Sequence, residues 1–297
     1  MTRWTTTLEL TPEMVSTPKG WVEVARTGSG PSVLFVHGTP GSWRQCVPLA
    51  EDLASDHEVV LPSRPGYGRT RIAVGRTHAD QADAYAAVLD SLGIAKTAIV
   101  GVSGGGPSSI AFASRHPDRT TALVLVCAVA PHLLQVPSST RFAARVPAVP
   151  QLVAPIVRAL GRRRLANPDR VRVELQKSLT PDEYVLADAD PSVTADLVRH
   201  ALSHVEAPPG LSGMRNDLRQ FDAAKRAGAP TYGVSIPTLV VHGDADPVVG
   251  LDQARFHTSA ITGAELKVYE ATGHLVVMTR RKEMSAVIRE FLQRRSG

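Results

Sequence analysis

The chain has little of several features that would narrow its function at once. Only two of its 297 residues are cysteines, Cys46 and Cys127, and 5% are aromatic. Two cysteines are too few for a disulfide framework, so we expect apolar packing to hold the core and a reducing, cytoplasmic location. Cys127 ends an apolar run and is interpreted as a small core residue rather than a reactive thiol.

Long apolar runs and concentrated charge are also missing. No run reaches the ~18 apolar residues of a membrane span. Residues 1–10 are polar and threonine-rich, unlike a signal peptide. The formal net charge is +5, but the basic residues are dispersed apart from Arg162-Arg163-Arg164, which is interpreted as a solvated loop or helix end. Because nucleic-acid surfaces need clustered basic and aromatic residues, we expect no nucleic-acid and no membrane partner.

Short apolar runs rich in β-branched residues alternate with longer helix-like segments. The expected strands are residues 33–36, 58–61, 98–102, 123–126, 238–241 and 266–269. The expected helices are residues 42–54, 77–92, 107–115, 251–261 and 281–291. The strands are continuously apolar, so both faces of the sheet should be covered. The order predicts an α/β fold with a mostly parallel sheet flanked by helices, and a hairpin of residues 23–26 with the Leu8 neighbourhood at its edge.

The alternation of strands and helices stops near Ala130 and resumes near Ser235. The region between is rich in proline and arginine and has a helical pattern. We therefore expect a core formed by residues 1–130 and 235–297, interrupted by a helical cap over residues 131–234. Three apolar residues of this insertion are candidates for the substrate pocket: Phe142, Met214 and Phe221.

The most informative segment is Gly101-Val102-Ser103-Gly104-Gly105-Gly106-Pro107, between an expected strand and an expected helix. A strand, a sharp glycine-lined turn with a serine at its tip, and a helix form the setting of a nucleophile elbow. We expect the flanking glycines, Gly101 and Gly105, to lie too close together for side chains. The helix is expected to begin at Gly104, with its free N–H groups facing whatever Ser103 attacks. A phosphate-binding turn is not favoured, because no Lys-Ser/Thr pair follows the glycines.

A serine hydroxyl needs a base to take its proton and a third group to orient that base. Asp246 follows one expected strand, and His274 follows the next. The carboxyl ends of parallel strands meet at one edge of a sheet, where such folds bind ligands. We therefore expect Ser103, Asp246 and His274 to meet there. Asp244 is the alternative acid, although aspartates also cap turns.

Taken together, these features make the chain similar to α/β-hydrolase-fold proteins with a helical cap, over nearly its whole length. Besides the Ser103 elbow and the serine–aspartate–histidine order, the turn His37-Gly38-Thr39-Pro40-Gly41 and the loop Pro65-Gly66-Tyr67-Gly68-Arg69 carry the resemblance. It implies an oxyanion hole made by the backbone N–H groups of Thr39 and Gly104. It implies neither a cofactor nor a metal.

Variants of this family narrow the chemistry. Epoxide hydrolases and haloalkane dehalogenases carry an aspartate at the elbow, where this chain has Ser103, which disfavours an alkyl-enzyme mechanism. Proline iminopeptidases usually carry a tryptophan after the serine, where this chain has Gly104, which disfavours a peptidase. Many relatives carry an aspartate at the position of Ser63, so the loop before Pro65 departs from the family pattern.

Four histidines and one tryptophan are candidates with two interpretations each. His37 and His242 precede glycines at strand ends and are interpreted as structural. His200 and His204 are spaced for one helix face, and without a third ligand near them we favour cap or surface histidines over a metal site. Trp43 follows the oxyanion turn and is either a core residue or a wall of the substrate pocket.

The sequence therefore predicts a serine hydrolase whose partner is a small ester-like molecule: a carboxylic ester, a lactone or a thioester. Ser103 would be the nucleophile, His274 the base and Asp246 the orienting acid. One alternative is a non-hydrolytic enzyme on the same scaffold, such as a lyase or a cofactor-free oxygenase, because a fold does not fix a reaction. The other is a ligand-binding, receptor-type protein with slow turnover.

Overall fold

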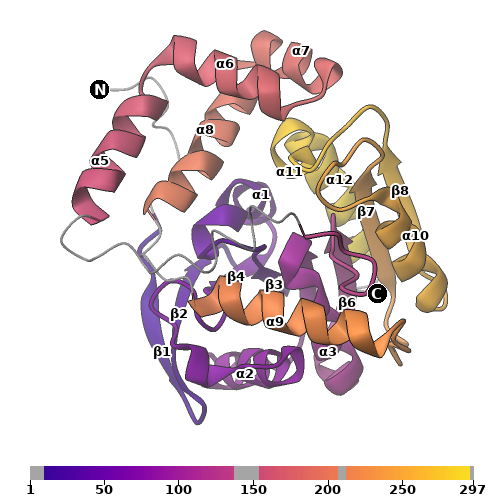
Figure 1. Ribbon diagram of the computed structural model, residues 1–297. Helices are drawn as coiled ribbons and strands as arrows, with labels where there is room; N and C mark the ends of the chain where they lie inside the picture. The colour runs from indigo at the N-terminus through magenta and orange to yellow at the C-terminus, as the bar shows by residue number, and fades with distance from the viewer. Residues whose placement is uncertain (1–9, 137–153, 207–211, 295–297) are drawn as a thin grey trace.

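One sheet organises the chain in the computed structural model, which describes residues 10–136, 154–206 and 212–294 (Figure 1). Within these ranges the strands lie in the order β1-β2-β4-β3-β5-β6-β7-β8. Strands β3 to β8 are parallel to their neighbours, whereas β2 pairs antiparallel with both β1 and β4. The predicted mostly parallel sheet is confirmed. The strands are β1 (Glu13–Thr17), β2 (Gly20–Thr27), β3 (Ser32–Val36), β4 (Glu58–Pro62), β5 (Thr97–Val102), β6 (Thr120–Val126), β7 (Thr238–Gly243) and β8 (Glu265–Tyr269).

The edge hairpin differs from the expected one in its first strand. Strand β2 pairs with Glu13–Thr17, while Leu8 lies outside the described residues. Thr17 lies opposite Gly20, so only two residues connect the strands. Such a tight connection places the immediately preceding segment beside β2. Gly20 has φ +121°, which is accessible to glycine at little cost.

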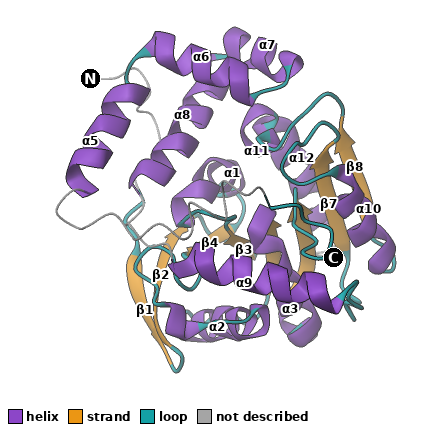
Figure 2. Ribbon diagram, in the orientation of Figure 1, coloured by secondary structure: helices purple, strands orange, loops and turns teal. Residues whose placement is uncertain are grey.

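Helices cover both faces of the sheet, as the continuous apolar strands predict (Figure 2). One face packs against α1 (Val47–Leu53), α11 (Val276–Thr279) and α12 (Arg281–Gln293), and the other against α2 (His78–Ser91), α3 (Gly106–Arg115) and α10 (Leu251–Ala260). The expected helix over residues 42–54 is divided into a 3₁₀ turn, η1 (Trp43–Cys46), and α1. Pro48 lies in the first turn of α1 and favours a helix start there.

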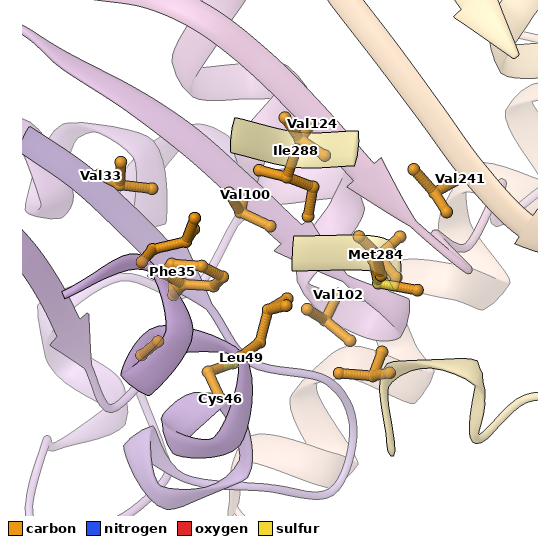
Figure 3. Close-up of a cluster of buried hydrophobic side chains, with 14 of the residues drawn as sticks. Val33, Phe35, Cys46, Leu49, Val100, Val102, Val124, Val241, Met284 and Ile288 are labelled. Carbon is orange, nitrogen blue, oxygen red and sulfur yellow. The ribbon is translucent and has the colours of Figure 1, made fainter. Parts of the chain in front are cut away.

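Alternate residues of each strand enter different layers of the core. On one face, Phe35 and Val100 pack with Leu49 of α1 and with Met284 and Ile288 of α12 (Figure 3). Their sequence neighbours enter the opposite layer, with α2 and α3: Leu34, Val36, Ile99, Leu123 and Leu125. Burying a large apolar side chain contributes about 1.5–3 kcal/mol. Packing on both faces therefore fixes the strand register, and with it the strand ends.

Between β6 and β7 the chain leaves the sheet. The described helices there are α5 (Ala154–Leu165), α6 (Pro168–Ser178), α7 (Pro181–Ala189), α8 (Pro191–Glu206) and α9 (Ser212–Ala227). In Figure 1, α5 to α8 gather at the top of the view, whereas α9 runs across the front. The group contacts the core at α11, where Thr279 Oγ1 donates to Glu183 Oε1 at 2.7 Å. Phe142 lies outside the described residues.

Within the described ranges, no helix is both long enough and apolar enough to cross a bilayer.

A buried histidine of α10 makes the stability of the fold depend on pH. His257 is fully buried, with Nε2 3.2 Å from the carbonyl oxygen of Ala128 and Nδ1 3.0 Å from the hydroxyl of Tyr232. Burial lowers the pKa of His257 to about 4. An unfolded histidine binds a proton near pH ~6.5. The contribution of the neutral, buried His257 to the free energy of unfolding is therefore fully present above that pH and is lost as the pH falls towards 4.

We expect His257→Gln to flatten the pH dependence of the free energy of unfolding between pH 7 and pH 5. One proton bound only by the unfolded state changes that free energy by about 1.4 kcal/mol per pH unit. Denaturant titrations of the unmodified protein and the variant at both pH values test this. Equal losses of stability on acidification would contradict the assignment.

Candidate active site

Ser103 lies at the tip of a strained turn between β5 and α3. Its φ is +49°, a backbone conformation that residues with side chains rarely adopt. The turn is the short 3₁₀ helix η3 (Ser103–Gly105), and the N–H of Val129 donates to the carbonyl oxygen of Ser103 at 3.0 Å. The neighbouring segment after β6 thus helps to hold the strained residue. The expected strand–turn–helix arrangement is present.

The flanking glycines are required for a different reason from the one expected. A Cβ on Gly101 would lie 2.6 Å from Ser109 Oγ, and one on Gly105 would lie 2.3 Å from the carbonyl oxygen of Val36. Their tightest contacts are therefore with helix α3 and strand β3, not with each other. The helix also starts later than expected: α3 begins at Gly106, because the first turn is a tighter 3₁₀ turn.

The structure brings the three side chains of the expected triad together. His274 Nε2 lies 3.1 Å from Ser103 Oγ, and His274 Nδ1 lies 2.6 Å from Asp246 Oδ2. Ser103 follows β5, Asp246 follows β7 and His274 follows β8, so the carboxyl ends of three parallel strands at one edge of the sheet carry all three. This geometry provides an unbroken path for a proton from the serine hydroxyl to a histidine oriented by a carboxylate.

Asp246, and not Asp244, contacts the histidine. Asp246 is buried, and its Oδ1 accepts hydrogen bonds from the backbone N–H groups of Val248 and Val249 at 2.8 and 2.9 Å. Burial by itself would raise the pKa of the Asp246 carboxyl, but His274 and the two amides together lower it. The carboxyl is therefore ionised at neutral pH. Asp244 is exposed and lies 3.4 Å from the backbone nitrogen of Thr272.

The two histidines interpreted as structural are both buried next to the site. His37 Nδ1 lies 2.8 Å from the carbonyl oxygen of Gly38, while its Nε2 accepts from the N–H of Arg64 at 2.9 Å. His242 Nε2 lies 2.7 Å from the carbonyl oxygen of Val249. Burial lowers the pKa of both imidazoles, so they stay neutral. Both nitrogens of His37, and Nε2 of His242, contact backbone groups.

The expected oxyanion residues lie against each other. A Cβ on Gly104 would meet Thr39 Oγ1 at 2.2 Å and the Thr39 backbone nitrogen at 3.2 Å. The N–H of Gly38 donates to Gln45 Oε1 at 2.7 Å and is therefore not free for a ligand. This leaves Thr39 as the residue of the turn whose N–H is the candidate donor beside Gly104.

A cavity of about 150 Å³ opens over Ser103 and His274. Of the residues expected to form the pocket, Trp43 is 3% exposed and packs in the core with α1. Phe221 packs with Leu134 and other buried residues, and Met214 is buried in α9; neither lines this cavity. The lining residues are Thr39, Gln45, Val102, Ser103, His200, His204, Val248, His274, Leu275, Val277 and Met278.

His200 and His204 enter this cavity from helix α8. Their rings are 4.7 Å apart, and His204 Nδ1 lies 2.9 Å from the carbonyl oxygen of His200. Burial, together with His204 and His274, lowers the pKa of His200 to about 3. His200 is therefore a neutral side chain at physiological pH. The two residues face the site from one of the inserted helices.

One group of three potential metal ligands occurs in the part of the chain that the structure describes. Its members are Cys127, Asp246 and His274, with ligand atoms within 4.8 Å of one another. Two of them are engaged with each other in the hydrogen bond described above. Burial and the Asp246 carboxylate raise the pKa of the Cys127 thiol well above its usual value. Because Asp246 and His274 already engage each other, the group fits a hydrogen-bonded relay.

Three charged residues that sequence reasoning missed support the site. Glu23 of β2 accepts hydrogen bonds from Ser63 Oγ at 2.8 Å and from the N–H of Arg69 at 3.1 Å. A carboxylate from β2 therefore contacts Ser63, the residue at which this chain differs from the family pattern. Arg64 and Asp217 form a buried ion pair at 2.7 Å. The sequence could have pointed to Glu23, because it is a charged residue inside an apolar strand. It contains no comparable signal for Asp217, which lies on a polar helix.

The two candidate acids are distinguished by matched substitutions. Asp246→Asn should slow fluorophosphonate labelling of Ser103 by orders of magnitude, because an amide favours the wrong imidazole tautomer; a comparable change costs about 10⁴ in kcat elsewhere. Asp244→Asn should stay within a few-fold of the unmodified protein. Labelling rates of the two variants measure the difference, and a reversed order would refute the assignment.

Known proteins resemble this chain over part or most of its length. The family model described as alpha/beta hydrolase fold matches residues 31–280. An uncharacterized hydrolase of Bacillus subtilis is 34% identical over 117 residues, which cover 39% of this chain and 41% of that protein. The 2-hydroxy-6-oxononadienedioate/2-hydroxy-6-oxononatrienedioate hydrolase of Burkholderia vietnamiensis is 27% identical over 283 residues, covering 90% of this chain and 89% of that protein.

Solved structures are similar to this chain over nearly its whole length. An alpha/beta hydrolase fold protein from Nakamurella multipartita has 29% identity and a TM-score of 0.75, covering 97% of this chain and 100% of its own. A thermophilic esterase from Thermogutta terrifontis has 25% identity and a TM-score of 0.66, covering 96% of this chain and 98% of its own. With a family model that spans most of its length and a sheet of the same class, the chain belongs to the alpha/beta hydrolase fold family.

Proposed function

We propose that the protein is a serine hydrolase that cleaves a small carboxylic ester, lactone or thioester through an acyl-enzyme intermediate. The observation that carries the proposal is the line of hydrogen-bonding contacts from Ser103 Oγ through His274 to Asp246, at the floor of a cavity. The hydrolase names of the relatives support hydrolysis, and the esterase among the similar structures supports an ester bond.

The proposed reaction begins with proton transfer. His274 Nε2 takes the Ser103 proton while Oγ attacks the substrate carbonyl, and the ionised Asp246 stabilises the imidazolium that forms. The backbone N–H groups of Thr39 and Gly104 hold the developing oxyanion. His274 then gives the proton to the leaving alcohol or thiol. A water molecule repeats the same steps on the acyl-enzyme and releases the acid.

A second candidate substrate class is suggested by the relatives named as hydrolases of dicarboxylates such as 2-hydroxy-6-oxononadienedioate. Such a substrate carries two carboxylates that need cationic or strongly donating partners. Among the described residues that line the cavity, no lysine or arginine is present, and His200 is neutral. A small cavity whose described lining contains no lysine or arginine favours an uncharged ester. Assaying the purified protein with both substrate classes decides between them.

We also propose that residues 131–234 act as a cap that selects substrates without taking part in the proton relay. The support is that His200 and His204 of α8 line the cavity, whereas Ser103, Asp246 and His274 all come from the segments on either side of the insertion. A wall residue that changes the room for one methylene shifts binding by roughly 1 kcal/mol. The cap would therefore set acyl or alcohol preference.

The nucleophile is tested by labelling and turnover together. A fluorophosphonate probe should attach to Ser103, and Ser103→Ala should abolish both labelling and p-nitrophenyl ester hydrolysis while the melting temperature changes little. Peptide mapping of the labelled protein identifies the site. Labelling at another serine, or full activity in the variant, would disprove the proposed nucleophile.

The pocket is tested by a chain-length series from p-nitrophenyl acetate to decanoate. His200→Ala should enlarge the cavity and move the optimum of kcat/KM towards longer acyl chains. Met214 belongs to the same inserted region but does not line the cavity, so Met214→Leu should leave the chain-length profile of kcat/KM unchanged. If Met214→Leu shifts the optimum and His200→Ala does not, the pocket lies where the sequence alone placed it.

A further inference from the structure

A buried ion pair lies directly behind the oxyanion turn and takes no part in the triad. The side chains of Arg64, in the loop after β4, and Asp217, in α9, are 0% and 1% exposed. Arg64 Nη2 donates to Asp217 Oδ1 at 2.7 Å, and Nη1 donates to Oδ2 at 3.0 Å. Two hydroxyl groups donate to the same Oδ2: Thr39 Oγ1 at 2.5 Å and Tyr67 Oη at 2.7 Å. One of the four hydrogen bonds to Asp217 thus comes from the oxyanion turn itself.

Stability alone is a weak reason for such an arrangement. Removing two charges from water is costly, and apolar side chains of similar volume often stabilise a core as well or better. Burial by itself would lower the pKa of the Arg64 guanidinium, but the Asp217 carboxylate raises it, so the guanidinium remains charged. What apolar side chains cannot do is accept the proton of a threonine hydroxyl and fix its direction. Thr39 is the residue of the oxyanion turn whose hydroxyl contacts both members of the ion pair.

The Thr39 side chain is held from several directions. Its Oγ1 donates to Asp217 and accepts from Arg64 Nη1 at 3.1 Å. Arg64 Nη1 also lies 3.4 Å from the carbonyl oxygen of Gly38, the peptide that precedes Thr39. On the other side, Thr39 packs so closely over Gly104 that a Cβ there would overlap Oγ1. The Thr39 side chain therefore links the buried ion pair to Gly104, while Arg64 also contacts the peptide that precedes the Thr39 N–H.

Asp217 reaches this place because the start of α9 is docked on the loop after β4. Ser212 Oγ and the N–H of Gly213 both donate to the carbonyl oxygen of Gly66, at 3.0 and 3.1 Å. A Cβ on Gly213 would lie 2.4 Å from the ring of Tyr67, so only glycine permits this approach. A residue of the inserted region is in this way fixed against the core.

We propose that Asp217 is a positioning residue for the oxyanion hole, acting through the hydroxyl of Thr39. The inference rests on the proposed function, because it takes the N–H groups of Thr39 and Gly104 as the oxyanion donors. Such donors stabilise a transition state only when they are already oriented before the charge develops. In this protein a cap helix would supply the carboxylate that keeps them oriented.

Asp217→Asn leaves Arg64 without its counter-charge and risks misfolding, so the decisive variants are at its hydrogen-bond donors. Thr39→Val keeps the shape and the backbone N–H but removes the hydroxyl. Thr39→Ser keeps the hydroxyl. Tyr67→Phe is the matched control, because it removes another hydrogen bond to the same Asp217 oxygen but keeps the ring that packs against His37 and leaves the Thr39 hydroxyl in place. The melting temperature of each variant reports its structural cost.

Two readouts separate positioning from stability: the second-order rate constant for fluorophosphonate labelling of Ser103, and kcat and KM for p-nitrophenyl acetate. Thr39→Val should lower the labelling rate and kcat by about 10-fold or more, up to the ~10²–10³-fold loss typical of removing an oxyanion donor completely. Its KM should change less than about two-fold. Thr39→Ser should recover most of the loss, and Tyr67→Phe should label nearly as fast as the unmodified protein despite a lower melting temperature.

The outcomes distinguish the inference from the function on which it rests. Labelling by Thr39→Val at the unmodified rate, with only the melting temperature lowered, would overturn the inference alone. If Tyr67→Phe loses as much labelling as Thr39→Val, the effect is structural and the inference is again wrong. Labelling of Ser103 without hydrolysis of any ester would overturn the proposed function, while the labelling rates would still test the inference. No labelling of the unmodified protein would overturn both.

Discussion

The burial of both faces of the parallel sheet is the constraint from which the site follows. Neighbouring strands present apolar side chains to α1 and α12 on one side and to α2 and α3 on the other. A slip of one residue in any strand would exchange these two layers, so the register is strongly specified. The carboxyl ends of β3, β5, β7 and β8 therefore lie at one edge of the sheet, with β6 between β5 and β7, in a fixed register. Thr39, Ser103, Asp246 and His274 follow these ends and meet as a consequence.

Three buried carboxylates also hold the loops around the site. Asp246, Asp217 and Glu23 are each almost inaccessible to water, and each is surrounded by donors. Backbone amides and His274 satisfy the first, Arg64 and two hydroxyls the second, and Ser63 and Arg69 the third. A buried charge is tolerated only when it is compensated in this way. Each of these carboxylates therefore holds a loop at the active edge in a defined place.

Much of the fold was predictable because the signals were local and repeated. The six parallel strands and the helices between them follow from apolar runs of strand length separated by longer helical patterns, and the structure contains them in a mostly parallel sheet. The elbow was predictable because a serine among glycines between a strand and a helix has few other uses. What failed were details of local geometry. The edge strand was misplaced from Glu13–Thr17 to the region of Leu8, and the contacts that require Gly101 and Gly105 were assigned to each other.

Sequence alone also determined which residue types meet at the edge of the sheet, since chain order and strand direction follow from patterns within about ten residues. Only the tertiary structure decided between Asp246 and Asp244, because both lie in one turn and just one points at the histidine. It likewise placed Trp43 in the core and His200 in the cavity, since helical spacing does not say what a helix faces. The Arg64–Asp217 pair spans 153 positions of the chain. Its members meet because α9 docks on the loop after β4, a contact between distant segments that no local pattern encodes.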